Sequence, residues 1–307
     1  MKFRVNLLSA IITAAGMGLA TSASAAPFFF TTGNPDGSLG AVTRNDSPGK
    51  VETETADDFI LAETTVINGA TITGLINAPV ANITNVEVEL YHVFPLDSIN
   101  PPSGRVLSRA NSPADVEIST ATRDGSDGTL RFSPSSLSAS FAVSNTVVNG
   151  INPNPSRTGG EGPASGEEVQ ITITFSDPIV LPPGHYFFRP EVGLTGGDFL
   201  YLSVAGTPVA PDLQAWIRNS RLAPDWVRIG TDVIGATPPA TAPKFNMAFS
   251  LTGNTIPQAG TPGEPSCHGE SVSALARQFG GIHAAASSLG FSSVDALQES
   301  LKEFCNP

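Results

Sequence analysis

Charged residues are scarce in this sequence, and basic residues are the scarcest. Only 14% of the 307 residues are charged, and 16 Lys and Arg stand against 28 Asp and Glu, for a formal net charge of −12. A nucleic-acid-binding protein needs a basic surface for the phosphates, so nucleic acid and anionic membrane surfaces are not expected as partners. The 30 Gly and 26 Pro predict frequent turns and disfavour a mostly helical enzyme or a coiled coil.

Long apolar runs are also rare, since the only candidate lies at the N-terminus. Residues 7–20 are mostly apolar, follow Lys2 and Arg4, and precede Ala23-Ser24-Ala25. The run is too short to span a bilayer, whereas the small residues after it suit a signal peptidase. We therefore expect residues 1–25 to be a signal peptide. The mature chain would begin at Ala26, carry 14 basic against 28 acidic residues, lack a membrane span, and be secreted or periplasmic.

Cysteine is limited to Cys267 and Cys305. An oxidising compartment permits only one intramolecular pairing, so a disulfide is expected. By closing its loop it would stabilise the C-terminal segment by roughly 3–4 kcal/mol. A metal site or a nucleophilic thiol is the alternative, but the sequence has no CxxC and only His268 is adjacent.

The local signatures of common enzymes are absent. There is no HExxH, GxSxG or P-loop, and no GxGxxG that follows a strand and opens a helix. Among the four scattered histidines, His92 shares the register of Val88 and Leu90, which predicts a core or sheet-face histidine. A site assembled by folding needs no local motif, because triads are defined by geometry.

Alternation of apolar and polar residues dominates residues 28–252. Val86, Val88 and Leu90 alternate with glutamates, and residues 169–175 alternate aliphatic with polar side chains. This period predicts strands with one solvated face, and about ten short strands without helices between them indicate an antiparallel β-sandwich, jelly-roll-like, in residues 26–252. Long loops are expected at 97–134 and 152–166. Further strand candidates are 59–61, 66–76, 141–148, 186–188, 199–204, 213–218, 226–229 and 245–251.

The composition changes after residue 252. Residues 253–266 are rich in Gly, Pro and Thr, which predicts a flexible linker. In residues 267–307 apolar residues recur every three or four positions, which predicts a helical hairpin whose first helix Gly280-Gly281 can split or kink. The apolar stripes are expected to pack on each other, with docking to a partner as the alternative.

Both tryptophans lie on one expected hairpin. Alternation places Ile217, Val227 and Ile229 on one side of it and four larger side chains on the other. If the aliphatic side is core, the other side can stack on sugar rings or bind an acidic ligand. The favoured interpretation is that a loop covers the indoles and the arginines stack on them, because tryptophan is largely buried on average. The predicted ligand-binding residues are Trp216, Arg218, Trp226 and Arg228.

Acidic residues cluster in two places, before Phe59 and in the turn 124–128. Clustered oxygen ligands on loops suit Ca²⁺, but neither segment has EF-hand spacing, so a solvated face or turn is the favoured interpretation and Ca²⁺ is the alternative. The candidate metal ligands are Asp57, Asp58, Asp124 and Asp127.

Three segments resemble a group of bacterial secreted proteins of unassigned function, some of which carry a PEP-CTERM-type sorting signal. They are Glu54-Thr55-Ala56-Asp57-Asp58-Phe59, Leu181-Pro182-Pro183-Gly184-His185-Tyr186-Phe187-Phe188 and Leu213-Gln214-Ala215-Trp216-Ile217-Arg218. The resemblance spans most of residues 28–252 and implies a secreted β-sandwich scaffold without naming a catalytic residue. The sorting signal is missing here, so sorting to the cell surface is not implied.

These observations favour an exported, non-enzymatic binding protein of the bacterial envelope or exterior, with a glycan as the first ligand class and another envelope protein as a second kind of partner. One alternative is a secreted hydrolase that uses Asp57 or Asp58 with His185, brought together by folding. Another is a purely structural envelope or matrix protein.

Overall fold

The computed structural model describes residues 26–98, 104–151, 157–205, 214–235, 241–257 and 259–306. The expected signal peptide, residues 1–25, lies outside these ranges. No helix within them is long and apolar enough to cross a membrane.

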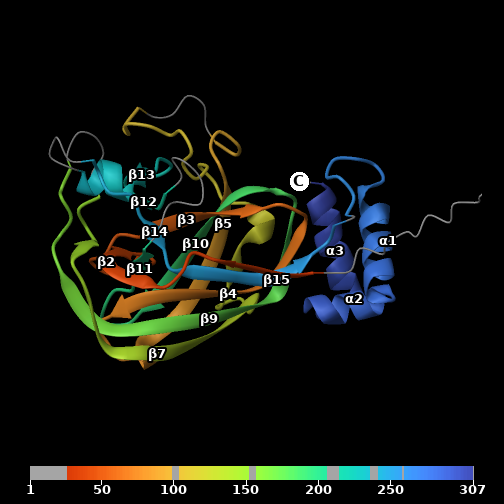
Figure 1. Cartoon of the computed structure of the whole chain (residues 1–307), viewed down its shortest axis with the longest axis horizontal. Helices are drawn as coiled ribbons and strands as arrows, with labels where there is room; N and C mark the ends of the chain where they lie inside the picture. Colours follow the sequence, from red (N-terminus) through yellow and green to blue (C-terminus); the bar gives the residue numbers. More distant parts are fainter. Residues whose placement is uncertain are drawn as a thin grey trace, which may run out of the picture.

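The described chain is mainly β and forms two sheets, with three helices at its C-terminal end (Figure 1). The larger sheet contains β1 (Pro27–Thr31), β2 (Pro35–Val42), β4 (Thr65–Ile76), β7 (Leu130–Val143), β8 (Asn145–Val147), β9 (Ala164–Leu181), β11 (Leu200–Val204), β14 (Asn246–Met247) and β15 (Phe249–Thr255). The smaller sheet contains β3 (Thr53–Leu61), β5 (Ile83–His92), β6 (Arg123–Asp124), β10 (Gly184–Leu194), β12 (Trp216–Asn219) and β13 (Val227–Arg228). All described strand pairs are antiparallel except β2 with β8.

One hydrophobic core joins the inner sides of the two sheets. It contains Ile72 of β4 and Val88 of β5 among many other aliphatic side chains. Phe188 of the smaller sheet stacks on Phe249 of the larger one, with ring centroids 5.0 Å apart. His92 lies on a sheet face as expected, and its ring centroid is 5.5 Å from that of Tyr186.

The expected loop 97–134 differs from the structure. It includes β6 and the first residues of β7. Serines occupy the solvated side of β7, and Pro134 is tolerated because this strand lies at a sheet edge. Of the expected loop 152–166, residues 152–156 lie outside the described ranges, and β9 already begins at Ala164. Of the expected strand 213–218, residue 213 lies outside the described ranges, and β12 begins at Trp216.

The C-terminal segment folds into three helices, because the first helix of the expected hairpin is divided in two. They are α1 (Cys267–Phe279), α2 (Ile282–Leu289) and α3 (Val294–Cys305). Gly280 ends α1 with a φ of 75°, a left-handed conformation that glycine adopts without a Cβ clash. The split at Gly280-Gly281 is therefore confirmed, and it creates a separate helix rather than a kink.

The helices pack on each other and on the larger sheet. Leu275, Leu289 and Leu301, one from each helix, share a buried cluster with Val66 of β4. This confirms that the apolar stripes of the helices pack on each other, and the packing buries them. Cys267 and Cys305 form the expected disulfide, with their Cα atoms 5.7 Å apart. In Figure 1 the helical module, residues 267–305, lies at one end of the two-sheet body.

The expected flexible linker, residues 253–266, is wrong over its described part. Strand β15 continues to Thr255. The Ile256 N–H then donates to the Thr64 carbonyl at 2.7 Å, and the Gly260 N–H donates to Ser271 Oγ at 2.9 Å. These bonds fix the connection against both the sheet and α1.

Candidate functional sites

The predicted hairpin is present, and alternation assigned its two sides correctly. Strands β12 and β13 pair antiparallel, with Trp216 opposite Arg228 and Ile217 opposite Val227. Ile217 and Val227 lie in the main core, together with Ile229.

The outer side of this hairpin is closed rather than open. Trp216 and Trp226 both have an exposed fraction of 0%. The indole N–H of Trp226 donates to the Ala114 carbonyl at 3.0 Å, so the segment after β5 lies over it. The Arg218 guanidinium carbon is 4.3 Å from the Trp226 ring centroid and that of Arg228 is 6.0 Å from the Trp216 ring centroid. The favoured interpretation is therefore confirmed, because a distant loop and the two arginines cover the rings, and the open stacking face at these four residues is wrong.

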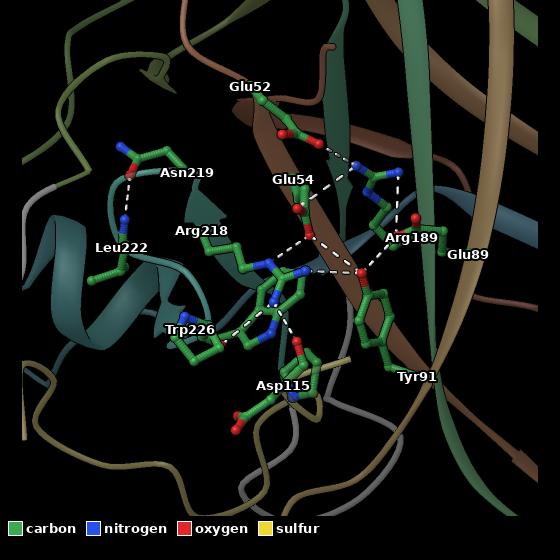
Figure 2. A network of polar contacts seen from close by, with 12 residues as sticks. Glu52, Glu54, Glu89, Tyr91, Asp115, Arg189, Arg218, Asn219, Leu222 and Trp226 are labelled. Carbon is green, nitrogen blue, oxygen red and sulfur yellow. Dashed lines mark hydrogen bonds and ion pairs between the residues drawn. The ribbon is translucent and has the colours of Figure 1, made fainter. Parts of the chain in front are cut away.

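Arg218 is held by acceptors from its own chain (Figure 2). Its Nε–H donates to Glu54 Oε2 at 2.6 Å, and Nη2 donates to the Tyr91 hydroxyl at 3.0 Å. Nη1 donates to the Asp115 carbonyl at 3.0 Å. This guanidinium therefore ties β12 to β3, β5 and the covering segment instead of facing an external ligand.

A second guanidinium, Arg189 of β10, lies in the same network (Figure 2) and is 1% exposed. Burial alone would lower its pKa, but Glu54, Glu89 and Glu191 raise that pKa well above its ordinary value. Two arginines thus face a larger number of carboxylates. The carboxylate oxygens within 4 Å of Arg189 belong to Glu191 (2.5 Å), Glu87 (2.9 Å), Glu52 (3.4 Å), Glu89 (3.5 Å) and Glu54 (3.8 Å).

The excess of carboxylates makes this network sensitive to protons. Burial raises the pKa of Glu191 to about 7, although Arg189 opposes the shift. Burial likewise raises the pKa of Glu87 to about 7, with Glu89 adding to the effect. Both carboxyl groups therefore take up protons near neutral pH.

We expect the protein to be more stable at pH 5.5 than at pH 8. The folded protein holds a proton on Glu191 up to a pKa of about 7, whereas the ordinary value is 4.5. Stability from this group is therefore complete below pH 4.5 and falls as pH rises through 7. Glu191→Gln should raise the free energy of unfolding at pH 8 by about 1–3 kcal/mol and flatten the pH dependence, as measured by urea unfolding.

Glu299→Gln is the matched control, because Glu299 is exposed on α3 and pairs only with Lys302 in the described structure. It should change the unfolding free energy by less than about 0.5 kcal/mol. A Glu191→Gln variant that is less stable than the natural protein at pH 8 would contradict the assignment of a raised pKa.

The structure brings His185 to Asp58 but not to Asp57. His185 Nε2 lies 2.8 Å from Asp58 Oδ2 on the outer side of the smaller sheet. Asp57, one residue earlier, turns to the other side, where its Oδ2 accepts the Met247 N–H at 2.7 Å. Burial and the neighbouring Asp58 raise the pKa of Asp57 well above its ordinary value. Direct contact meets one requirement of an acid–base pair, and the hydrolase hypothesis stays a prediction.

The four candidate calcium ligands do not converge. Asp57 and Asp58 lie on β3 with the separate partners just described, whereas Asp124 accepts from Asn85 Nδ2 at 2.7 Å. Asp127 accepts the Thr129 N–H at 2.8 Å and closes the turn. In the part of the chain that the structure describes, no group of three His, Cys, Asp or Glu side chains is placed to hold a metal ion. The calcium alternative is therefore not supported among the described residues, and Asp127 serves a turn, as the favoured interpretation expects.

A row of hydroxyl groups crosses the outer side of the larger sheet. The strand register sets five residues side by side, on β7, β9, β4, β15 and β1 in turn. Directly paired residues project to the same side of a sheet, so these hydroxyls share one surface, called the hydroxyl face below. Thr71 and Ser250 also bond to each other, with their oxygens 2.7 Å apart. The members of the row are Ser133, Thr172, Thr71, Ser250 and Thr31.

The next row of the same surface contains a hollow and an exposed ring. Register places Arg131, Thr174, Gly69, Thr252 and Phe29 side by side. Phe29 is 66% exposed, more than any other large hydrophobic residue in the described chain. Because Gly69 lacks a side chain, a hollow of about 350 Å³ opens between its neighbours, and Thr71 and Thr172 of the hydroxyl face also line it.

The sequence predictions did not include this surface. Its signals are the repeats Thr71-Ile72-Thr73 and Thr172-Ile173-Thr174, in which threonine alternates with the core isoleucine on each strand. Alternation identifies the solvated side of each strand, but only the register between strands shows that these positions are adjacent.

Comparison of the chain with known protein families, curated proteins and solved structures finds no match. The resemblance to bacterial secreted proteins therefore stays a prediction.

Proposed function

We propose that this protein is an exported, non-enzymatic binding protein for neutral polysaccharides, built on a jelly-roll-like β-sandwich. The observation that carries the proposal is the hydroxyl face together with the exposed Phe29 ring beside Thr252. Hydroxyl groups both donate and accept hydrogen bonds, as sugar hydroxyls do, and an exposed aromatic ring offers an apolar platform to a sugar ring.

Charge supports a neutral ligand. The protein has a net charge of −12, yet neither row of this surface contains an acidic residue, and Arg131 is the only basic one. A polyanion would meet long-range repulsion from the rest of the protein, whereas a neutral glycan would not. The disulfide is consistent with export to an oxidising compartment.

Phe29→Ala should weaken polysaccharide binding about tenfold, equivalent to about 1.4 kcal/mol, because the ring's contact with the sugar is lost. The assay measures depletion of the protein from solution by insoluble cellulose, chitin, xylan and mannan, and affinity electrophoresis covers soluble neutral glycans. Tryptophan emission is a poor reporter, because both indoles are buried away from this surface.

Leu96→Ala is the matched control. Leu96 is 60% exposed and lies outside the larger sheet, after β5, so its truncation should leave binding unchanged. If the natural protein binds none of these polysaccharides, or if both variants lose binding equally, the proposed function is wrong.

A further inference from the structure

The hollow above Gly69 is a distinct feature of the surface just described. Thr252 of β15 and Thr174 of β9 pair with Gly69 of β4 from its two sides. Gly69 cannot readily be filled, since a Cβ there would lie 2.8 Å from Thr252 Oγ1 and 3.1 Å from the Ile173 carbonyl oxygen. Glycine is therefore favoured at this position, and the hollow lies over it between Thr174 and Thr252.

The helical module closes one side of the hollow. Gly290, in the turn between α2 and α3, lines it together with Asn68. A Cβ on Gly290 would lie 3.9 Å from Asn68 Cβ and 3.8 Å from Pro178 Cγ, so the turn sits in van der Waals range of the sheet. Across the strands the surface continues past Thr252 to Phe29 and past Thr174 to Arg131. The helical module thus borders the hollow on one side, and the row of residues from Phe29 to Arg131 extends beyond the hollow in both directions across the strands.

The lining is uncharged and rich in groups that both donate and accept hydrogen bonds. Asn68 carries an amide, and its oxygen lies 3.5 Å from Thr252 Oγ1. Thr71, Thr172 and Thr174 add hydroxyls. A volume of about 350 Å³ is at the lower end for a ligand pocket, which suits one sugar unit rather than a larger compact ligand.

We propose that this hollow is a subsite for one unit of a neutral polysaccharide chain that lies across the strands, an inference that rests on the proposed function. Phe29 lies under a neighbouring unit, and the helical module forms the side wall. Strands are about 4.8 Å apart, so the four spacings from Phe29 to Arg131 extend about 19 Å, enough for several units in line. Asn68 and Thr174 then determine affinity through hydrogen bonds to the unit in the hollow.

The test measures dissociation constants by calorimetry with cellohexaose, chitohexaose, xylohexaose and mannohexaose, and with an oligogalacturonate as the anionic probe. Asn68→Ala and Thr174→Val should each bind a neutral hexasaccharide at least fivefold more weakly, because each removes a polar group from the hollow. Valine keeps the branched shape and strand preference of threonine. Thr84→Val, at an exposed position near the start of β5 in the other sheet, is the matched control and should bind normally.

The results separate the subsite from the function. If the natural protein and Phe29→Ala differ in binding while Asn68→Ala and Thr174→Val match the natural protein, the subsite is wrong and the proposed function stands. If only oligogalacturonate binds, and Arg131→Gln abolishes that binding, the ligand is anionic and the inference fails. If no glycan binds, the proposed function fails and the subsite fails with it. Unfolding midpoints within a few degrees of the natural protein show that each variant is folded.

Discussion

Arg189→Met should lower the free energy of unfolding by about 3–5 kcal/mol at pH 8, the largest effect expected for a single substitution in this protein. The methionine replaces the aliphatic part of the arginine without its charge, so the carboxylates of Glu87 and Glu191 lose their arginine partner and the buried Glu54 keeps only Arg218. Urea unfolding followed by tryptophan fluorescence measures the loss, because both indoles are buried beside this network.

Acid should restore part of the stability of Arg189→Met, since protonation removes the unpaired charges. We expect the difference from the natural protein to shrink between pH 8 and pH 5. Arg221→Met, at an exposed position of the loop after β12, is the control and should stay within about 0.5 kcal/mol at both pH values. A loss of equal size at pH 8 and pH 5 would show that packing rather than charge accounts for the effect.

Replacing Cys267 and Cys305 together with alanine should destabilise the helical module by about 3–4 kcal/mol, because the loop they close restricts the unfolded segment. The cysteines are 38 residues apart and lie at the start of α1 and the end of α3. Amide hydrogen exchange should accelerate in α1, α2 and α3 while the strands of the two sheets keep their protection.

The natural protein treated with a reductant should reproduce the exchange pattern of the double variant, and the reductant should have no further effect on the variant itself. Equal protection of the helices in all samples would mean that the contacts of Leu275, Leu289 and Leu301 with Val66 hold the module without the disulfide. Faster exchange throughout both sheets would mean that the module and sheets unfold together.

Alternation in the sequence predicted the sides of the strands well. It placed Ile217 and Val227 in the core and Trp216 on the opposite side, as found. It failed to predict whether that opposite side is open, because Ala114, more than a hundred residues away from Trp226 in the sequence, supplies the cover. Period two assigns a side chain to a face but carries no information about a loop that later lies on it.

The charge network and the hydroxyl face were missed for a related reason. The sequence did not predict the charge network around Arg189, because its glutamates come from β3, β5 and β10 and meet only through the strand order. In the same way, Ser133 and Thr31 become members of one row only through three intervening strands. By contrast, the disulfide could be predicted without knowledge of the fold, since two cysteines allow only one intramolecular pairing.

The pairing of β1 with β15 has a consequence for how the chain acquires its structure. Phe28 and Gly253 are direct neighbours in the register although some 220 positions separate them along the chain. The larger sheet cannot complete its β1 edge until the segment around residue 253 is available for pairing. Contacts between residues so far apart in the sequence slow folding, so we expect this edge to form late.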